Sequence, residues 1–106
     1  MSKETIGAFT FRNEGDGCLT SKYLEHAEAT PYTECCKREK GSNDVFEGEY
    51  KTTWLQIDGN YTAKLSINRS GDVYHLYWSD LNSGSIVYEG TAMLFEGSLV
   101  GTYWNP

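Results

Sequence analysis

The chain lacks the features that mark several large classes of protein. No run of about 18 apolar residues occurs, so nothing in the sequence suits a membrane-spanning helix. Only three cysteines are present, and an odd number fits reduced thiols better than a disulfide framework. The opening residues have no apolar stretch typical of a signal peptide, so we expect a cytoplasmic protein. A mature secreted form whose leader had been removed would share these properties.

Basic residues are scarce over most of the chain. The net charge is −6, and residues 41–106 carry eight acidic residues against only Lys51, Lys64 and Arg69. A surface that binds nucleic acid or an anionic membrane needs clustered Lys and Arg. The charge distribution therefore argues against nucleic acid and membrane partners.

What the chain does contain is a series of short aromatic-rich segments separated by glycine-containing turns. The segments are Val45–Ile57, Tyr61–Asn68, Val73–Asp80, Ile86–Phe95 and Ser98–Trp104. Turns at intervals of about 8–12 residues are typical of antiparallel β proteins. We predict a mainly β, antiparallel meander of six to eight strands that forms a small barrel or a strongly curved sheet. With 106 residues, it is expected to be a single domain spanning residues 1–106.

The N-terminal part shows one hairpin and one irregular insert. Ile6–Arg12 alternates around two phenylalanines, and Cys18–Leu24 follows a turn cluster at residues 13–17, which predicts a hairpin. Residues 26–44 are poor in β-branched residues. A helix is predicted over Tyr32–Lys40, because Thr33 could cap its start and Gly41 could end it.

The aromatic residues suggest a binding cavity. Aromatics make up 14% of the chain, more than a small core readily encloses. Alternation places many of them on the inner face, where a concave aromatic surface could bind a small apolar or cyclic ligand. The candidate ligand-binding residues are Tyr50, Trp54, Tyr61, Tyr74 and Tyr88. Trp54 and Tyr61 flank one turn and are expected to meet at one end of the barrel. The alternative is that the rings simply fill the core and an interface.

The sequence offers few candidate metal ligands and few candidate catalytic groups. Cys18, Glu34, the adjacent Cys35 and Cys36, and two histidines lack the spacing of a zinc site. No nucleophile and base, and no pair of carboxylates, is placed together by local sequence. We expect no metal, no cofactor and no enzymatic activity.

Two further hypotheses concern partners. The strand Val73–Asp80 is apolar or aromatic on both faces, which predicts a homodimer paired through Tyr77 and Trp78. The alternative to a ligand-binding protein is an interaction module, an adaptor or inhibitor that uses the acidic surface and the Cys35-Cys36 insert.

One family resemblance extends over residues 46–104. The order of turns and aromatics, from Gly59-Asn60-Tyr61 through His75-Leu76-Tyr77-Trp78 to Gly97-Ser98-Leu99-Val100, is similar to that of small, mostly uncharacterised bacterial β-meander proteins of lipocalin-like or avidin-like (calycin-type) build. The resemblance implies a ligand-binding barrel. It transfers no functional residue, because the ligand contacts of avidin-like proteins have no matching positions here.

Overall fold

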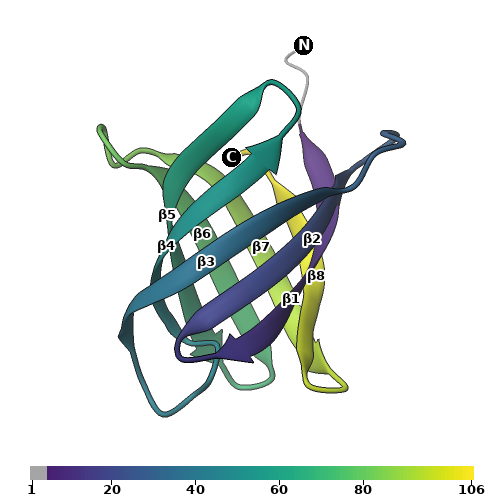
Figure 1. The fold of residues 1–106 in the computed structure, drawn as a ribbon. Helices are drawn as coiled ribbons and strands as arrows, with labels where there is room; N and C mark the ends of the chain where they lie inside the picture. Colours follow the sequence, from purple (N-terminus) through teal and green to yellow (C-terminus); the bar gives the residue numbers. More distant parts are fainter. Residues whose placement is uncertain (1–4) are drawn as a thin grey trace.

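The computed structural model describes residues 5–106 and shows eight antiparallel strands closed into a barrel (Figure 1). The strands are β1 (Ile6–Gly15), β2 (Cys18–Glu25), β3 (Tyr32–Gly41), β4 (Gly48–Gln56), β5 (Gly59–Ser70), β6 (Val73–Asp80), β7 (Ile86–Phe95) and β8 (Ser98–Trp104). Each strand pairs with the next, and β1 pairs with β8 to close the sheet. The predicted antiparallel meander barrel is therefore confirmed.

The helix predicted over residues 32–40 is wrong, because this segment is strand β3. It alternates in burial: Glu34 and Cys36 are buried, whereas Cys35 and Lys37 are exposed. β3 pairs with β2 over residues 32–37 and with β4 over residues 33–41. The backbone hydrogen bonds to the two neighbouring strands outweigh the helix propensity of these residues, which differs between residue types by only about 0.5 kcal/mol. No helix long and apolar enough to cross a membrane occurs in residues 5–106.

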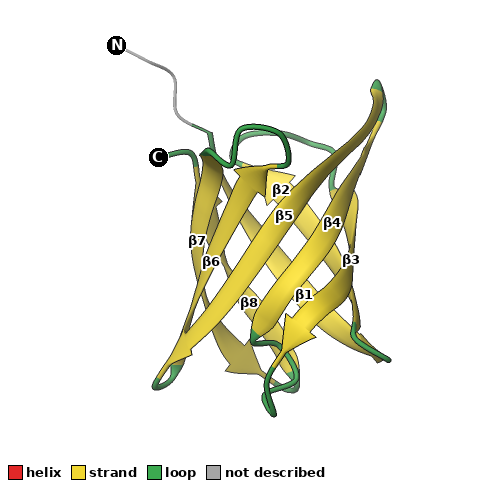
Figure 2. Ribbon diagram, turned by 90° about the vertical axis from the view of Figure 1, so that its left-hand side faces the viewer, coloured by secondary structure: helices red, strands yellow, loops and turns green. Residues whose placement is uncertain are grey.

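The two ends of the barrel differ. The described chain begins and ends at the upper end, which also carries the β2–β3, β4–β5 and β6–β7 connections, and the β4–β5 hairpin rises above it (Figure 2). The lower end carries the other four connections, including the β3–β4 loop of residues 42–47. The β2–β3 connection at the upper end, residues 26–31, and the β3–β4 loop at the lower end, residues 42–47, are equally long.

The alternation expected from the sequence sorts most side chains correctly. In β6, whose direction the sequence left open, Tyr74, Leu76 and Trp78 point inward and are buried. Leu94 in β7 continues the alternation of the buried Gly90 and Ala92 but is 46% exposed. It lies one residue before Phe95, which ends β7 at the lower rim, where the inner face meets solvent.

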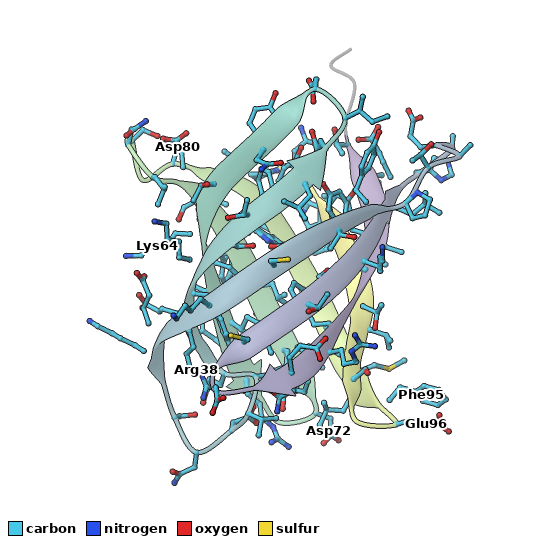
Figure 3. All side chains as sticks on the ribbon, viewed as in Figure 1. Arg38, Lys64, Asp72, Asp80, Phe95 and Glu96 are labelled. Carbon is cyan, nitrogen blue, oxygen red and sulfur yellow. The ribbon has the colours of Figure 1, made fainter. Side chains whose placement is uncertain are left out.

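The β3–β4 loop closes the lower end of the barrel. Phe46 at its centre is 1% exposed, and its ring centroid lies 6.3 Å from that of Tyr74. The Tyr50 hydroxyl donates a hydrogen bond of 2.8 Å to the Phe46 carbonyl. Arg38, near the lower end of β3 in Figure 3, donates from one guanidinium nitrogen to two loop carbonyls at 2.5 and 2.6 Å. The loop is therefore fixed by packing and by hydrogen bonds.

Asp44 anchors the same loop through both carboxylate oxygens. Oδ1 accepts the backbone N–H groups of Phe46 and Glu47 at 2.8 and 3.0 Å. Oδ2 accepts the Tyr74 hydroxyl at 2.7 Å and an Arg69 N–H at 2.9 Å. Burial alone would raise the pKa of Asp44, but these four donors lower it to about 2. The ionised form of Asp44 is therefore the one that the folded loop stabilises.

We expect Phe46→Ala to lower the free energy of unfolding by about 3–5 kcal/mol, because it removes a buried ring and leaves a cavity. Urea unfolding followed by circular dichroism measures this change. The matched control is Val45→Ala, since Val45 is the adjacent residue and is 55% exposed. The control is expected to change stability by less than about 0.5 kcal/mol. Equal effects of the two variants would contradict the role of Phe46 as a plug.

The lowered pKa of Asp44 predicts a specific acid dependence. A depressed pKa contributes stability that is present above the unfolded value near pH 4 and is lost as pH falls toward about 2. Asp44→Asn should therefore cost about 1–2 kcal/mol at pH 7 and almost nothing near pH 2. Urea unfolding across this pH range tests it, with Asp16→Asn in the exposed β1–β2 turn as the control. A cost that stays constant with pH would show that charge is not the cause.

Candidate functional site

A cavity of about 240 Å³ occupies the upper half of the barrel. It is lined by Phe9, Tyr23, Glu25, Glu34, Trp54, Gln56, Tyr61, Trp78, Tyr88 and Tyr103. Exposure rises along its wall, from 2% for Glu34 and 4% for Trp78 to 48% for Tyr61. The cavity therefore has its floor at Glu34 and Trp78, near mid-barrel, and opens to solvent at the upper end.

The wall is built from aromatic rings that pack against one another. Ring centroids lie 5.7 Å apart for Trp54 and Tyr88, and 5.6 Å apart for Tyr88 and Tyr103. Phe9 and Trp78 lie 5.8 Å apart, and all three pairs meet edge to face. This geometry suits the charge distribution of aromatic rings and holds each ring in place. The cavity is thus preformed rather than dependent on a ligand for its shape.

A glycine on β1 makes room for part of this wall. A Cβ atom on Gly7 would lie 2.3 Å from the Tyr103 ring, far inside van der Waals contact. Gly7 is paired with Tyr103 across the β1–β8 junction. The Tyr103 ring therefore lies directly over the backbone of Gly7. Any larger residue at position 7 would force the ring to move.

The floor carries a single buried carboxyl group, that of Glu34. Its Oε2 accepts the Trp78 indole N–H at 2.9 Å and the hydroxyl of Thr52, and the Cys36 thiol lies 3.7 Å away. Trp54 is the direct neighbour of Glu34 across the β3–β4 pair. The Trp54 side chain is a further, weaker hydrogen-bond partner of the Glu34 carboxyl group. Within residues 5–106, the bonds from Thr52, Trp78 and Cys36 all go to Oε2, and none as close reaches Oε1. This second oxygen belongs to a side chain that lines the cavity.

The electrostatic setting of Glu34 is unusual for an acidic residue. Of the Lys, Arg and His side chains in residues 5–106, none lines the cavity. Burial raises the pKa of Glu34, and the hydrogen bonds from Thr52 and Trp78 oppose this only in part. The pKa of the neighbouring Cys36 thiol is raised as well, by burial and by the Glu34 charge. The folded barrel therefore favours the protonated form of Glu34 relative to the unfolded chain.

A raised carboxyl pKa has a definite consequence for stability. The native state holds a proton that the unfolded chain has lost, so stability falls as pH rises through the folded-state pKa. Glu34→Gln removes this titration and keeps an oxygen for Thr52 and Trp78. We expect its free energy of unfolding to exceed that of the wild type at pH 8, with a smaller difference at pH 4. Urea titrations at both pH values measure this, and a Gln variant less stable at pH 8 would refute it.

The predicted site residues separate into two groups. Trp54, Tyr61 and Tyr88 line the cavity, and Trp54 and Tyr61 are direct neighbours across the β4–β5 pair, as expected. Tyr50 and Tyr74 lie in the filled lower half, 0% and 1% exposed, and do not line the cavity. Their hydroxyls instead donate hydrogen bonds to the β3–β4 loop of residues 42–47. The inward direction of Tyr50 was predicted and that of Tyr74 was left open by the sequence, but which half of the barrel they occupy was not predicted.

The surface proposed for a homodimer needs one change. Trp78 is 4% exposed, and its indole N–H is bonded to Glu34, so this residue cannot take part in subunit contacts. Tyr77, on the opposite face of β6, is only half-buried. The pairing of two copies stays a prediction, and of the two named residues only Tyr77 is on the outside.

Sequence reasoning missed Glu34 as a cavity residue. The helix predicted for residues 32–40 hid the strand alternation that places Glu34 and Cys36 inside. The sequence itself carries no alternation signal here, since Thr33 is less polar than Glu34 and Cys35 is the same residue type as Cys36. Cys35 and Cys36 point to opposite sides of the sheet, one exposed and one buried. No group of three or more His, Cys, Asp or Glu within residues 5–106 is arranged to hold a metal ion.

Comparisons with protein families, with curated proteins and with solved structures find no match to this chain. The eight-stranded antiparallel barrel is compatible with the calycin-like build that the sequence resembles. Membership of such a family stays a prediction. The case for function therefore depends on the geometry of the cavity.

Proposed function

We propose that this protein binds a small, largely apolar, ring-containing ligand in the upper cavity of its barrel. The observation that carries the proposal is an open, preformed cavity of about 240 Å³ with aromatic walls and one buried polar group. Ligand sites are typically concave and apolar, with a few polar groups that orient the ligand. A well-packed barrel of this size without such a role would be expected to fill both halves, as it fills the lower one.

The volume limits the ligand to one or two rings. An apolar cavity of about 150 Å³ is enough to bind benzene. The cavity here is larger, at about 240 Å³, but lies below the common range of about 300–1,000 Å³ for drug-sized ligands. The mouth lies beside Tyr61, the exposed lining residue at the start of β5, so a ligand can enter without opening the sheet.

The proposal is one of binding without chemistry. The thiol closest to the floor, that of Cys36, does not line the cavity, and its raised pKa keeps it protonated and weakly nucleophilic. The second carboxyl group of the wall, Glu25, belongs to a half-buried side chain at the upper end of β2, whereas Glu34 is fully buried. The wall otherwise consists of aromatic rings and Gln56. These groups suit recognition better than catalysis.

The first test uses 2-phenylethanol, a neutral one-ring compound. We expect it to bind with a Kd on the order of 1 mM, equivalent to about 0.5 kcal/mol per non-hydrogen atom. Trp54→Ala should weaken binding at least about tenfold, because the phenyl ring of 2-phenylethanol loses one wall of its site. Amide and aromatic NMR shifts during titration give both the affinity and the location.

The matched control is Phe95→Ala. Phe95 is 60% exposed and points away from the barrel at the β7–β8 turn, at the opposite end from the cavity (Figure 3). This variant should bind 2-phenylethanol as the wild type does. Because Trp54 is half-buried, its truncation should cost about 1–3 kcal/mol, less than a fully buried Trp. No shifts at Trp54, Tyr88 or Tyr103 up to about 20 mM ligand would end the proposal.

A further inference from the structure

We infer that the ligand carries a positively charged amine next to its ring, and that the Glu34 carboxylate at the cavity floor is its partner. This inference rests on the ligand-binding function proposed above and specifies the chemical class of the ligand. It follows from three independent features of the cavity: an incompletely bonded buried carboxyl group, the sign of the charges around it, and the nature of the walls.

The first feature is the bonding of Glu34. The side chain is 2% exposed, and its close hydrogen bonds within the described chain, from Thr52, Trp78 and the Cys36 thiol, all go to Oε2. The Trp54 side chain adds a weaker hydrogen bond to the carboxyl group. A carboxylate can accept about four hydrogen bonds over its two oxygens. Oε1 is the polar atom of the floor left for a ligand, and an ammonium group is the donor that binds a carboxylate most strongly.

The second feature is the sign of the charges. Buried carboxylates are normally paired with a cation or a metal, because isolated charges are costly in an interior. The two ion pairs found in residues 5–106 join Arg12 to Glu14 and Arg69 to Asp44, both away from the cavity. The second carboxyl group of the wall, Glu25, adds to the negative potential near the mouth. Within residues 5–106 no cation lines the cavity beside Glu34, so a bound ammonium group supplies the missing counter-ion, and its binding is coupled to release of the proton that burial favours on Glu34.

The third feature is the wall itself. Trp54, Tyr61, Tyr88 and Tyr103 present electron-rich rings, which attract cations and repel anions. The free-energy cost of desolvating a cation is smaller in such a site than in an aliphatic cavity, because the ring faces attract the cation. The ring of the ligand then packs against the walls while its amine lies at the floor. The same walls disfavour carboxylate-bearing ligands of the same size.

The test compares three compounds of nearly equal shape and different charge: 2-phenylethylamine, 2-phenylethanol and phenylacetate. At pH 7.5 we expect the amine to bind wild-type protein at least about tenfold more tightly than the alcohol, with phenylacetate weakest. Isothermal titration calorimetry and NMR titration measure the affinities. This comparison needs no variant to fold.

Glu34→Gln then identifies the partner of the amine. It should bring the affinity for the amine within about threefold of that for the alcohol, both measured on this variant, while leaving near-ultraviolet circular dichroism unchanged. The control is Glu49→Gln, which makes the same charge change on the exposed outer face of β4 and should keep the tenfold preference.

The outcomes separate the two proposals. Equal binding of amine and alcohol by the wild type would overturn the inference about charge but keep the proposed function. Binding of none of the three compounds would overturn both. A preference for the amine that survives in Glu34→Gln but is lost in Glu25→Gln would also overturn the inference, since the charge partner would then be the residue at the mouth.

Discussion

The pairing of β1 with β8 is the constraint on which the rest of the structure depends. Closure forces alternate residues of all eight strands into one enclosed space, with Phe9 facing Gly101 across the junction. It also determines how close opposite walls come, so that Gly7 must lack a side chain for Tyr103 to fit. Once the sheet is closed, each inward residue either fills the interior or leaves a cavity.

The two halves of the barrel resolve this choice differently. In the lower half, Phe46 and the loop of residues 42–47 complete a packed core fixed by Asp44. In the upper half, large rings pack against each other around a space rather than into it. The lower half supplies stability, and this allows the upper half to hold a buried carboxyl group that is itself unfavourable. The proposed function thus depends on a packed lower half that stabilises the barrel and a hollow upper half that contains the cavity.

The fold was largely predictable, whereas the site was only partly so. Strict alternation in β4, β5 and β8 and the spacing of the turns indicate the meander, because strand periodicity is a local property of the chain. Trp54 and Tyr61 could be placed together for the same reason. Glu34 could not, since only pairing with β2 and β4 makes residues 32–41 a strand. The plug formed by Phe46 also depends on contacts that span the barrel, which local patterns do not encode.

The most direct test of the account is an intermolecular nuclear Overhauser experiment on the protein saturated with 2-phenylethylamine. The account predicts contacts from the phenyl protons of the ligand to the rings of Trp54, Tyr88 and Tyr103, with the methylene beside the amine nearest to Glu34 and Trp78. Contacts instead to outward residues such as Tyr77 or Phe95, with none inside the barrel, would contradict it.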